Sequence, residues 1–126
     1  MKKPQKKLSP EKSPHSPAAV LPACVAKNRD LNSLIEYAPD SIVSKTLLDK
    51  PVGAVTLFAF DAGQKLSEHT TPYDALVQVI DGAAAITIAG KTKKVSAGQI
   101  IIMPANVPHA VAAERKFKML LIMIRA

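Results

Sequence analysis

A chain of 126 residues is long enough for one domain with a real hydrophobic core and too short for two of ordinary size. With three phenylalanines, two tyrosines and no tryptophan, its core must consist mainly of aliphatic side chains and methionine, which suits packed β-strands. More than half of the net charge of +7 lies in the first 17 residues, which carry five lysines and one glutamate, and because no basic stripe remains elsewhere we expect no nucleic-acid partner.

Residues 1–25 are predicted to be a disordered, basic, proline-rich tail in front of a single domain at residues 26–126. The first 17 residues contain four prolines and hardly any apolar side chains, so they cannot offset the entropy that ordering would cost. His15 lies in this stretch and is expected to be solvated and without a function.

The one cysteine, Cys24, excludes an internal disulfide and fits a reducing compartment. The letters "LPAC" resemble a lipoprotein cleavage site, but the apolar run before it, residues 18–23, is shorter than a signal core and contains Pro22. No run approaches the roughly 20 apolar residues that span a bilayer. We therefore expect a cytoplasmic protein with no membrane partner.

One short helix is expected after the tail. Residues 28–38 place apolar side chains at helical spacing, with Asp30 as a possible N-cap and Pro39 as the stop.

About eight short runs with strand character follow, separated by turn signals such as Asp81-Gly82 and Ala89-Gly90. They occupy residues 41–48, 54–60, 74–81, 83–89, 92–96, 99–104, 108–113 and 116–124. This regular succession is typical of an antiparallel sandwich or barrel.

Two runs, residues 100–103 and 119–124, are apolar on both strand faces. A strand with one solvent-exposed face should alternate between apolar and polar residues. Because these two runs do not alternate, another part of the protein or a partner must cover their outer face. A homodimer packed sheet on sheet is one explanation. The alternative is that the helix or the N-terminal segment covers it within one chain.

Two spaced motifs lie within these strands. The first runs from Gly63 to Gly82 and the second from Gly98 to Ala113, and both resemble the paired motifs of the cupin superfamily. The matching positions are Gly63, His69, Gly82, Gly98, Pro104 and His109. Asn106 and Ala113 depart from the second motif, where the family has glycine and asparagine. The resemblance implies an all-β fold, an antiparallel jelly-roll barrel (a double-stranded β-helix), here with one short N-terminal helix.

In that family, two histidines and a glutamate of the first motif and one histidine of the second bind a divalent metal inside the barrel. This chain has Thr71 and Ala75 where the second histidine and the glutamate would stand. His69 and His109 remain as ligands for a weakly held divalent metal, namely Zn, Ni, Fe, Mn or Cu. Asp74 is the first candidate for a third ligand, although strand alternation turns it outward unless a bulge intervenes.

Other residues near the first motif can contact an organic ligand. The Thr71 hydroxyl can donate a hydrogen bond, and the Tyr73 ring can wall a pocket. Met103, Met119 and Met123 lie in apolar strand runs and are interpreted as core residues in preference to copper ligands.

The resemblance leaves the function open, because one fold hosts many chemistries. The leading hypothesis is a small cupin, dimeric, that binds a small organic molecule in the barrel beside His69 and His109. Whether it is an enzyme is undecided. The alternative hypotheses are a non-catalytic ligand-sensing module with a degenerate metal site and a purely structural module.

Overall fold

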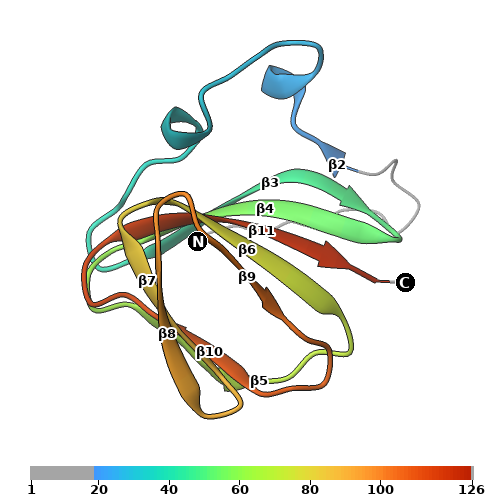
Figure 1. Cartoon of the computed structure of the whole chain (residues 1–126). Helices are drawn as coiled ribbons and strands as arrows, with labels where there is room; N and C mark the ends of the chain where they lie inside the picture. Colours follow the sequence, from blue (N-terminus) through green and yellow to red (C-terminus); the bar gives the residue numbers. More distant parts are fainter. Residues whose placement is uncertain (1–18, 126) are drawn as a thin grey trace.

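The computed structural model describes residues 19–125, which form two antiparallel sheets facing each other (Figure 1). The larger sheet has six strands in the order β2-β3-β4-β11-β6-β9, and the smaller has four in the order β5-β10-β7-β8. The all-β antiparallel prediction is therefore confirmed. The strands are β2 (Ala19–Val20), β3 (Ile42–Lys50), β4 (Gly53–Phe60), β5 (Lys65–His69), β6 (Asp74–Asp81), β7 (Ala83–Ile88), β8 (Lys91–Ser96), β9 (Ile100–Met103), β10 (His109–Ala112) and β11 (Phe117–Ile124).

Each of the eight predicted runs overlaps one strand, and the structure adds β2 and β5. The segment that forms β5, Lys65–His69, has Leu66 as its one apolar residue, so it lacks the alternation that marks a half-buried strand. It forms a strand because β10 offers it a free edge for hydrogen bonding. This matters for function, since β5 carries His69.

The predicted helix at residues 28–38 is a single 3-10 turn, η2 (Leu31–Leu34). Asp30 occupies its N-cap position, but the side chain makes no capping hydrogen bond, and the Asp30 carbonyl instead accepts hydrogen bonds from the backbone and hydroxyl of Ser33. Ile35 is already extended, and packing on the sheet overrides the helical spacing. Among residues 19–125, no helix is long and apolar enough to cross a membrane.

The predicted tail falls partly outside the described residues, which exclude residues 1–18 and with them His15. Its remaining part forms β2, which pairs with β3, and a second 3-10 turn, η1 (Pro22–Cys24).

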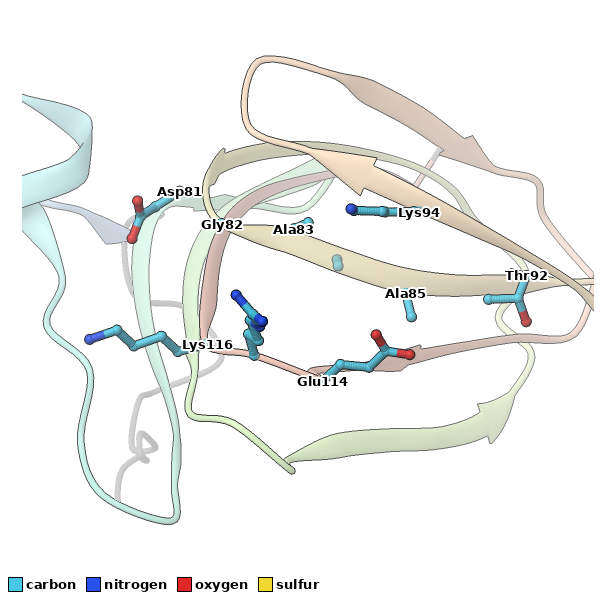
Figure 2. A pocket seen from close by; sticks show the side chains of 10 residues that line it. Asp81, Gly82, Ala83, Ala85, Thr92, Lys94, Glu114 and Lys116 are labelled. Atoms are coloured by element: carbon cyan, nitrogen blue, oxygen red, sulfur yellow. The ribbon is translucent and has the colours of Figure 1, made fainter.

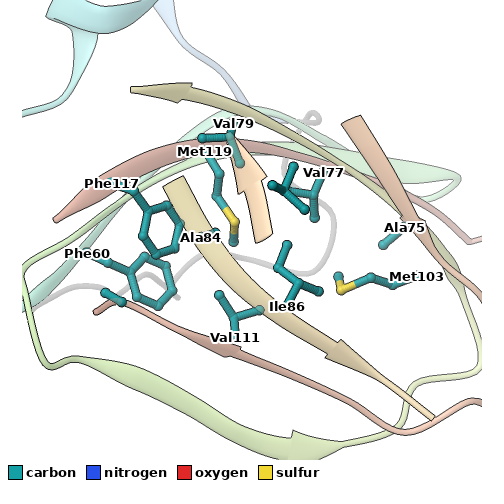
Figure 3. Close-up of a cluster of buried hydrophobic side chains, with 12 residues drawn as sticks. Phe60, Ala75, Val77, Val79, Ala84, Ile86, Met103, Val111, Phe117 and Met119 are labelled. Carbon is teal, nitrogen blue, oxygen red and sulfur yellow. The ribbon is translucent and has the colours of Figure 1, made fainter. Parts of the chain in front are cut away.

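The main core lies between the two sheets (Figure 3). Phe60 of β4 and Phe117 of β11 are fully buried and stack with their ring centroids 4.6 Å apart. Aliphatic side chains and methionines fill the rest, as the composition predicts. The other buried members are Ala75, Val77, Val79, Ala84, Ile86, Val95, Met103, Val111, Ala113 and Met119.

A second hydrophobic cluster lies on the outer face of the six-stranded sheet, where residues of the N-terminal segment pack on it. Figure 1 shows this segment running along the outer side of the sheet. Ile35 is buried there against Leu57 and Ala59 of β4. Polar contacts hold the segment in place. The ammonium of Lys118, a residue 8% exposed, donates to the Asn32 carbonyl at 2.6 Å and to its side-chain oxygen at 2.9 Å.

A second polar contact holds the N-terminal segment on the sheet. It is a hydrogen bond of 2.5 Å from the Tyr37 hydroxyl to the Asp81 carboxylate. The ammonium groups of Lys116 and Lys118 lie over the Tyr37 ring, 4.8 and 5.0 Å from its centroid. Burial raises the pKa of the Tyr37 hydroxyl, and the hydrogen bond to Asp81 and the carboxylate's negative charge raise it further.

Tyr37→Phe is expected to lower the free energy of unfolding by about 1 kcal/mol near neutral pH, since it removes this hydrogen bond. The folded-state pKa of Tyr37 lies above the unfolded value of about 10, so the unfolded chain loses the proton first and the Tyr37 contribution falls as pH rises above about 10. The stability gap between the parent and the Tyr37→Phe variant should therefore narrow at alkaline pH. Urea unfolding across an alkaline pH series measures it, and two parallel stability curves would contradict the assignment.

Candidate functional site

The structure brings His69 and His109 together. His69 ends β5 and His109 begins β10, and the two residues are direct partners in the antiparallel ladder. Their ring centroids lie 4.4 Å apart with the rings at 68°. Two residues far apart along the chain are thus brought together by a single strand pairing.

The two rings are engaged through the same nitrogen, Nδ1. Nδ1 of His69 lies 2.8 Å from the Ser67 carbonyl, and Nδ1 of His109 lies 3.2 Å from the Val107 carbonyl. A carbonyl can only accept, so Nδ1 carries the hydrogen in both rings. In the neutral rings Nε2 then has a free lone pair, which can bind a metal ion or accept a hydrogen bond.

A cavity of about 90 Å³ lies beside the pair, between the two sheets. His109 is 5% exposed, whereas His69 is exposed to solvent, so the histidine pair lies at the opening of the cavity. Most of the wall is apolar. The lining residues are Phe58, Leu66, His69, Thr71, Ala75, Met103, His109, Val111, Met119, Leu121 and Met123.

A larger and more open hollow, of about 910 Å³, is lined in part by the β7 and β8 strands and the loop before β11 (Figure 2). Figure 2 shows Lys94 and Glu114 on opposite sides of it. Its lining includes neither histidine. We therefore place the candidate site at the smaller cavity, where imidazole groups meet apolar surface.

Thr71 belongs to the cavity lining, as the sequence suggests for a ligand contact. Its hydroxyl donates to the Tyr73 carbonyl at 3.1 Å, so it also shapes the turn into β6. Tyr73 is half-buried and does not line the cavity.

Asp74, the predicted third metal ligand, is not brought to the histidines. Its carboxylate accepts a hydrogen bond of 2.8 Å from the Ala105 backbone, and its neighbour Ala75 is the residue that faces the cavity. No bulge turns the strand at this point, so alternation keeps Asp74 on the outer side. Within residues 19–125, no group of three or more His, Cys, Asp or Glu side chains is placed to hold a metal ion. The four-ligand divalent set of the resemblance therefore does not fit the residues present.

The sequence predicts Met103, Met119 and Met123 as core residues, and the structure also places all three in the cavity lining. Met103 and Met119 are members of the buried cluster, so the core interpretation agrees with their burial. The signal for the cavity is the two-residue alternation that puts Met103, Ala75 and Met123 on the inner face of three neighbouring strands.

This chain matches one family model and is similar to several solved structures. The family model for the cupin domain (Cupin_2) matches residues 56–125. The crystal structure of the conserved SPY1581 protein of unknown function from Streptococcus pyogenes is 35% identical, covers 90% of this chain and 98% of its own, and superposes with a TM-score of 0.80. A cupin 2 conserved barrel domain protein from Leptotrichia buccalis is 44% identical over 75% of this chain and 46% of its own, with a TM-score of 0.73.

Among curated proteins, the uncharacterized protein SCO3923 from Streptomyces coelicolor is 38% identical over 56 residues. That match covers 44% of this chain and 53% of the relative, so it spans about half the length of the curated protein.

Proposed function

Because the chain belongs to the cupin family, whose domain model matches residues 56–125, we propose that it binds a small organic molecule inside its barrel, with the polar end of the molecule at His69 and His109. One observation carries the proposal. Two imidazoles, each with its Nδ1 engaged by a backbone carbonyl, leave two Nε2 atoms free at the edge of an apolar cavity. His109 is 5% exposed, and a free polar atom on so buried a residue requires a partner.

The cavity limits the size of the ligand. Its volume of about 90 Å³ is well below the roughly 300–1,000 Å³ of pockets for drug-sized molecules. The ligand therefore has few non-hydrogen atoms, or extends past the exposed His69 into solvent. A short aliphatic chain ending in a carboxylic acid suits the site, because the acid can give its proton to an imidazole and stay beside it as a carboxylate.

A divalent metal at this pair would be weakly held. Two imidazoles supply fewer ligands than the three that catalytic zinc sites normally keep, and the Asp74 carboxylate is engaged with Ala105. We therefore propose that the site binds a ligand, and we assign no reaction to it.

We also propose a homodimer, formed through the outer face of the six-stranded sheet. A single row of aliphatic side chains crosses all six strands there. In ladder order it consists of Val20, Leu48, Val55, Ile122, Leu76 and Ile102. Residues 31–37 cover the neighbouring cluster around Leu57 and Leu120 and leave this row open, with Ile102 58% exposed.

A second copy of the chain is the occupant that best suits this row. A two-fold axis would place the same aliphatic row on both sides of the contact, so each apolar surface meets another. Residues 1–17, which lead into β2, hold too few apolar side chains to cover six aliphatic residues.

The proposed setting is the cytoplasm. Cys24 is the one cysteine of the chain, so an internal disulfide cannot form, and this fits a reducing compartment.

Titration of metal-free protein with straight-chain carboxylic acids, from propionic to hexanoic, tests the ligand proposal. We expect saturable shifts of the His69 and His109 imidazole resonances in ¹H–¹³C spectra. Affinity should rise about fourfold for each added methylene until the cavity is full, since burying one CH₂ contributes about 0.8 kcal/mol.

His109→Ala should weaken binding of the best acid at least about tenfold, because it removes a charge-assisted hydrogen bond. His15→Ala is the matched control and should leave the affinity unchanged. If the cavity resonances shift no more than that of His15, or if both variants bind equally well, the proposal fails.

A further inference from the structure

Every methionine of the chain except Met1 lines the cavity that holds the histidine pair. The three come from two strands, with Met103 on β9 and Met119 and Met123 on β11. Thioether sulfur thus gathers at the same cavity as the free imidazole nitrogens, and no carboxylate or thiol lines it.

Two of the three methionines flank Ala75. Met103 and Met123 are its direct ladder partners, on β9 and β11 respectively. Side chains opposite each other in an antiparallel ladder start about 5 Å apart at Cβ. The two thioethers therefore border the space that Ala75 leaves empty, at the position where the first motif of the family carries a glutamate. Figure 3 shows Ala75 and Met103 side by side at one end of the core, whereas Met119 lies farther in, toward Phe117.

The available donors are neutral and include soft sulfur. A divalent ion would bring two charges into an apolar cavity with no carboxylate to balance them, and the cost of desolvating an ion grows with the square of its charge. A monovalent ion costs far less to bury. Thioether and imidazole ligands are also those that select Cu(I) among the biological metals.

We propose that His69, His109, Met103 and Met123 form a binding site for monovalent copper. The imidazoles contribute their free Nε2 atoms at the cavity mouth, and the thioethers approach from the opposite sheet. Met119 contributes to the deep wall and is not a ligand. The inference uses the cavity of the proposed function, but it predicts a different occupant.

Anaerobic titration of the full chain with Cu(I), in competition with a chromogenic Cu(I) chelator, tests the site. One Cu(I) is expected to bind per chain. The double variant Met103→Leu/Met123→Leu should lose at least about tenfold in affinity, while the matched control Met119→Leu stays within about threefold of the parent. Leucine nearly conserves the volume of methionine, so both variants should fold.

A second measurement identifies the ligands directly. In protein labelled with ¹³C at the methionine methyls, Ag(I), used as a closed-shell substitute for Cu(I), should shift the methyl resonances of Met103 and Met123 and leave that of Met1 in place.

Zn(II) that binds as tightly as Cu(I), a double variant that loses less than about tenfold, or a Met119→Leu variant that loses as much as the double variant would each overturn the assignment. Because the carboxylic-acid titration is done on metal-free protein and the copper titration without any acid, failure of one proposal leaves the other standing.

Discussion

Replacing Gly82 with alanine is expected to lower the free energy of unfolding by about 2–5 kcal/mol, the largest effect we predict for a single methyl group in this protein. Gly82 joins β6 to β7 with a φ of +72°, a backbone conformation that disfavours any side chain. A Cβ atom there would lie 2.5 Å from the Lys116 carbonyl oxygen and 3.1 Å from the Phe117 Cβ. The backbone of one strand would have to move away from the other.

Gly90→Ala is the control that separates the stability cost of the steric clash from the cost of placing a side chain at a positive φ. Gly90 has a φ of +81°, but nothing lies within 4 Å of the point that a Cβ atom would occupy, so the expected cost is about 1 kcal/mol. Denaturant unfolding of the two variants side by side measures the difference. Equal losses of stability would show that the close approach to β11 does not matter.

Replacing Ile102 with lysine is expected to convert the proposed dimer into a monomer. Each dimer would carry two ammonium groups at the aliphatic row, and burying an unpaired charge in an apolar contact costs several kcal/mol. The dimer dissociation constant should therefore rise at least about 100-fold. Light scattering coupled to size-exclusion chromatography, over a series of protein concentrations, gives the mass of each species.

Val25→Lys provides the control for this change. Val25 is 53% exposed, close to the 58% of Ile102, but it belongs to the N-terminal segment and not to the sheet. It should leave the assembly unaltered. A parent protein that is monomeric at every concentration, or an Ile102→Lys variant that still dimerises, would exclude this face as the interface.

The fold could be predicted because strand alternation and turn residues are local signals. The Ala89-Gly90 pair illustrates this, since it marks a turn in the sequence and forms the turn between the paired strands β7 and β8 in the structure. The helical spacing of residues 28–38 predicts the right place but the wrong length, because Ile35 gains more from packing on Leu57 than from continuing the helix.

The site could be predicted only in outline. The spacing of the motifs identifies His69 and His109 as a pair, but the strand that carries His69 has too few apolar residues to be recognised. The neighbours of Ala75 depend on which residue of β9 and of β11 stands opposite it, and this register is set by contacts across the whole sheet. For that reason the methionines could be assigned to the core but not to the cavity.

The position of β5 at the sheet edge has a consequence for how a ligand reaches the cavity. β5 pairs with β10 alone, and that pairing is itself irregular between His109 and Val111. Edge strands with few partners open at a free-energy cost far below that of global unfolding. We therefore expect β5, which carries His69, to open more readily than β10, which stays paired with β7 and keeps His109 in place. A ligand is then expected to enter the cavity by local opening of this sheet edge.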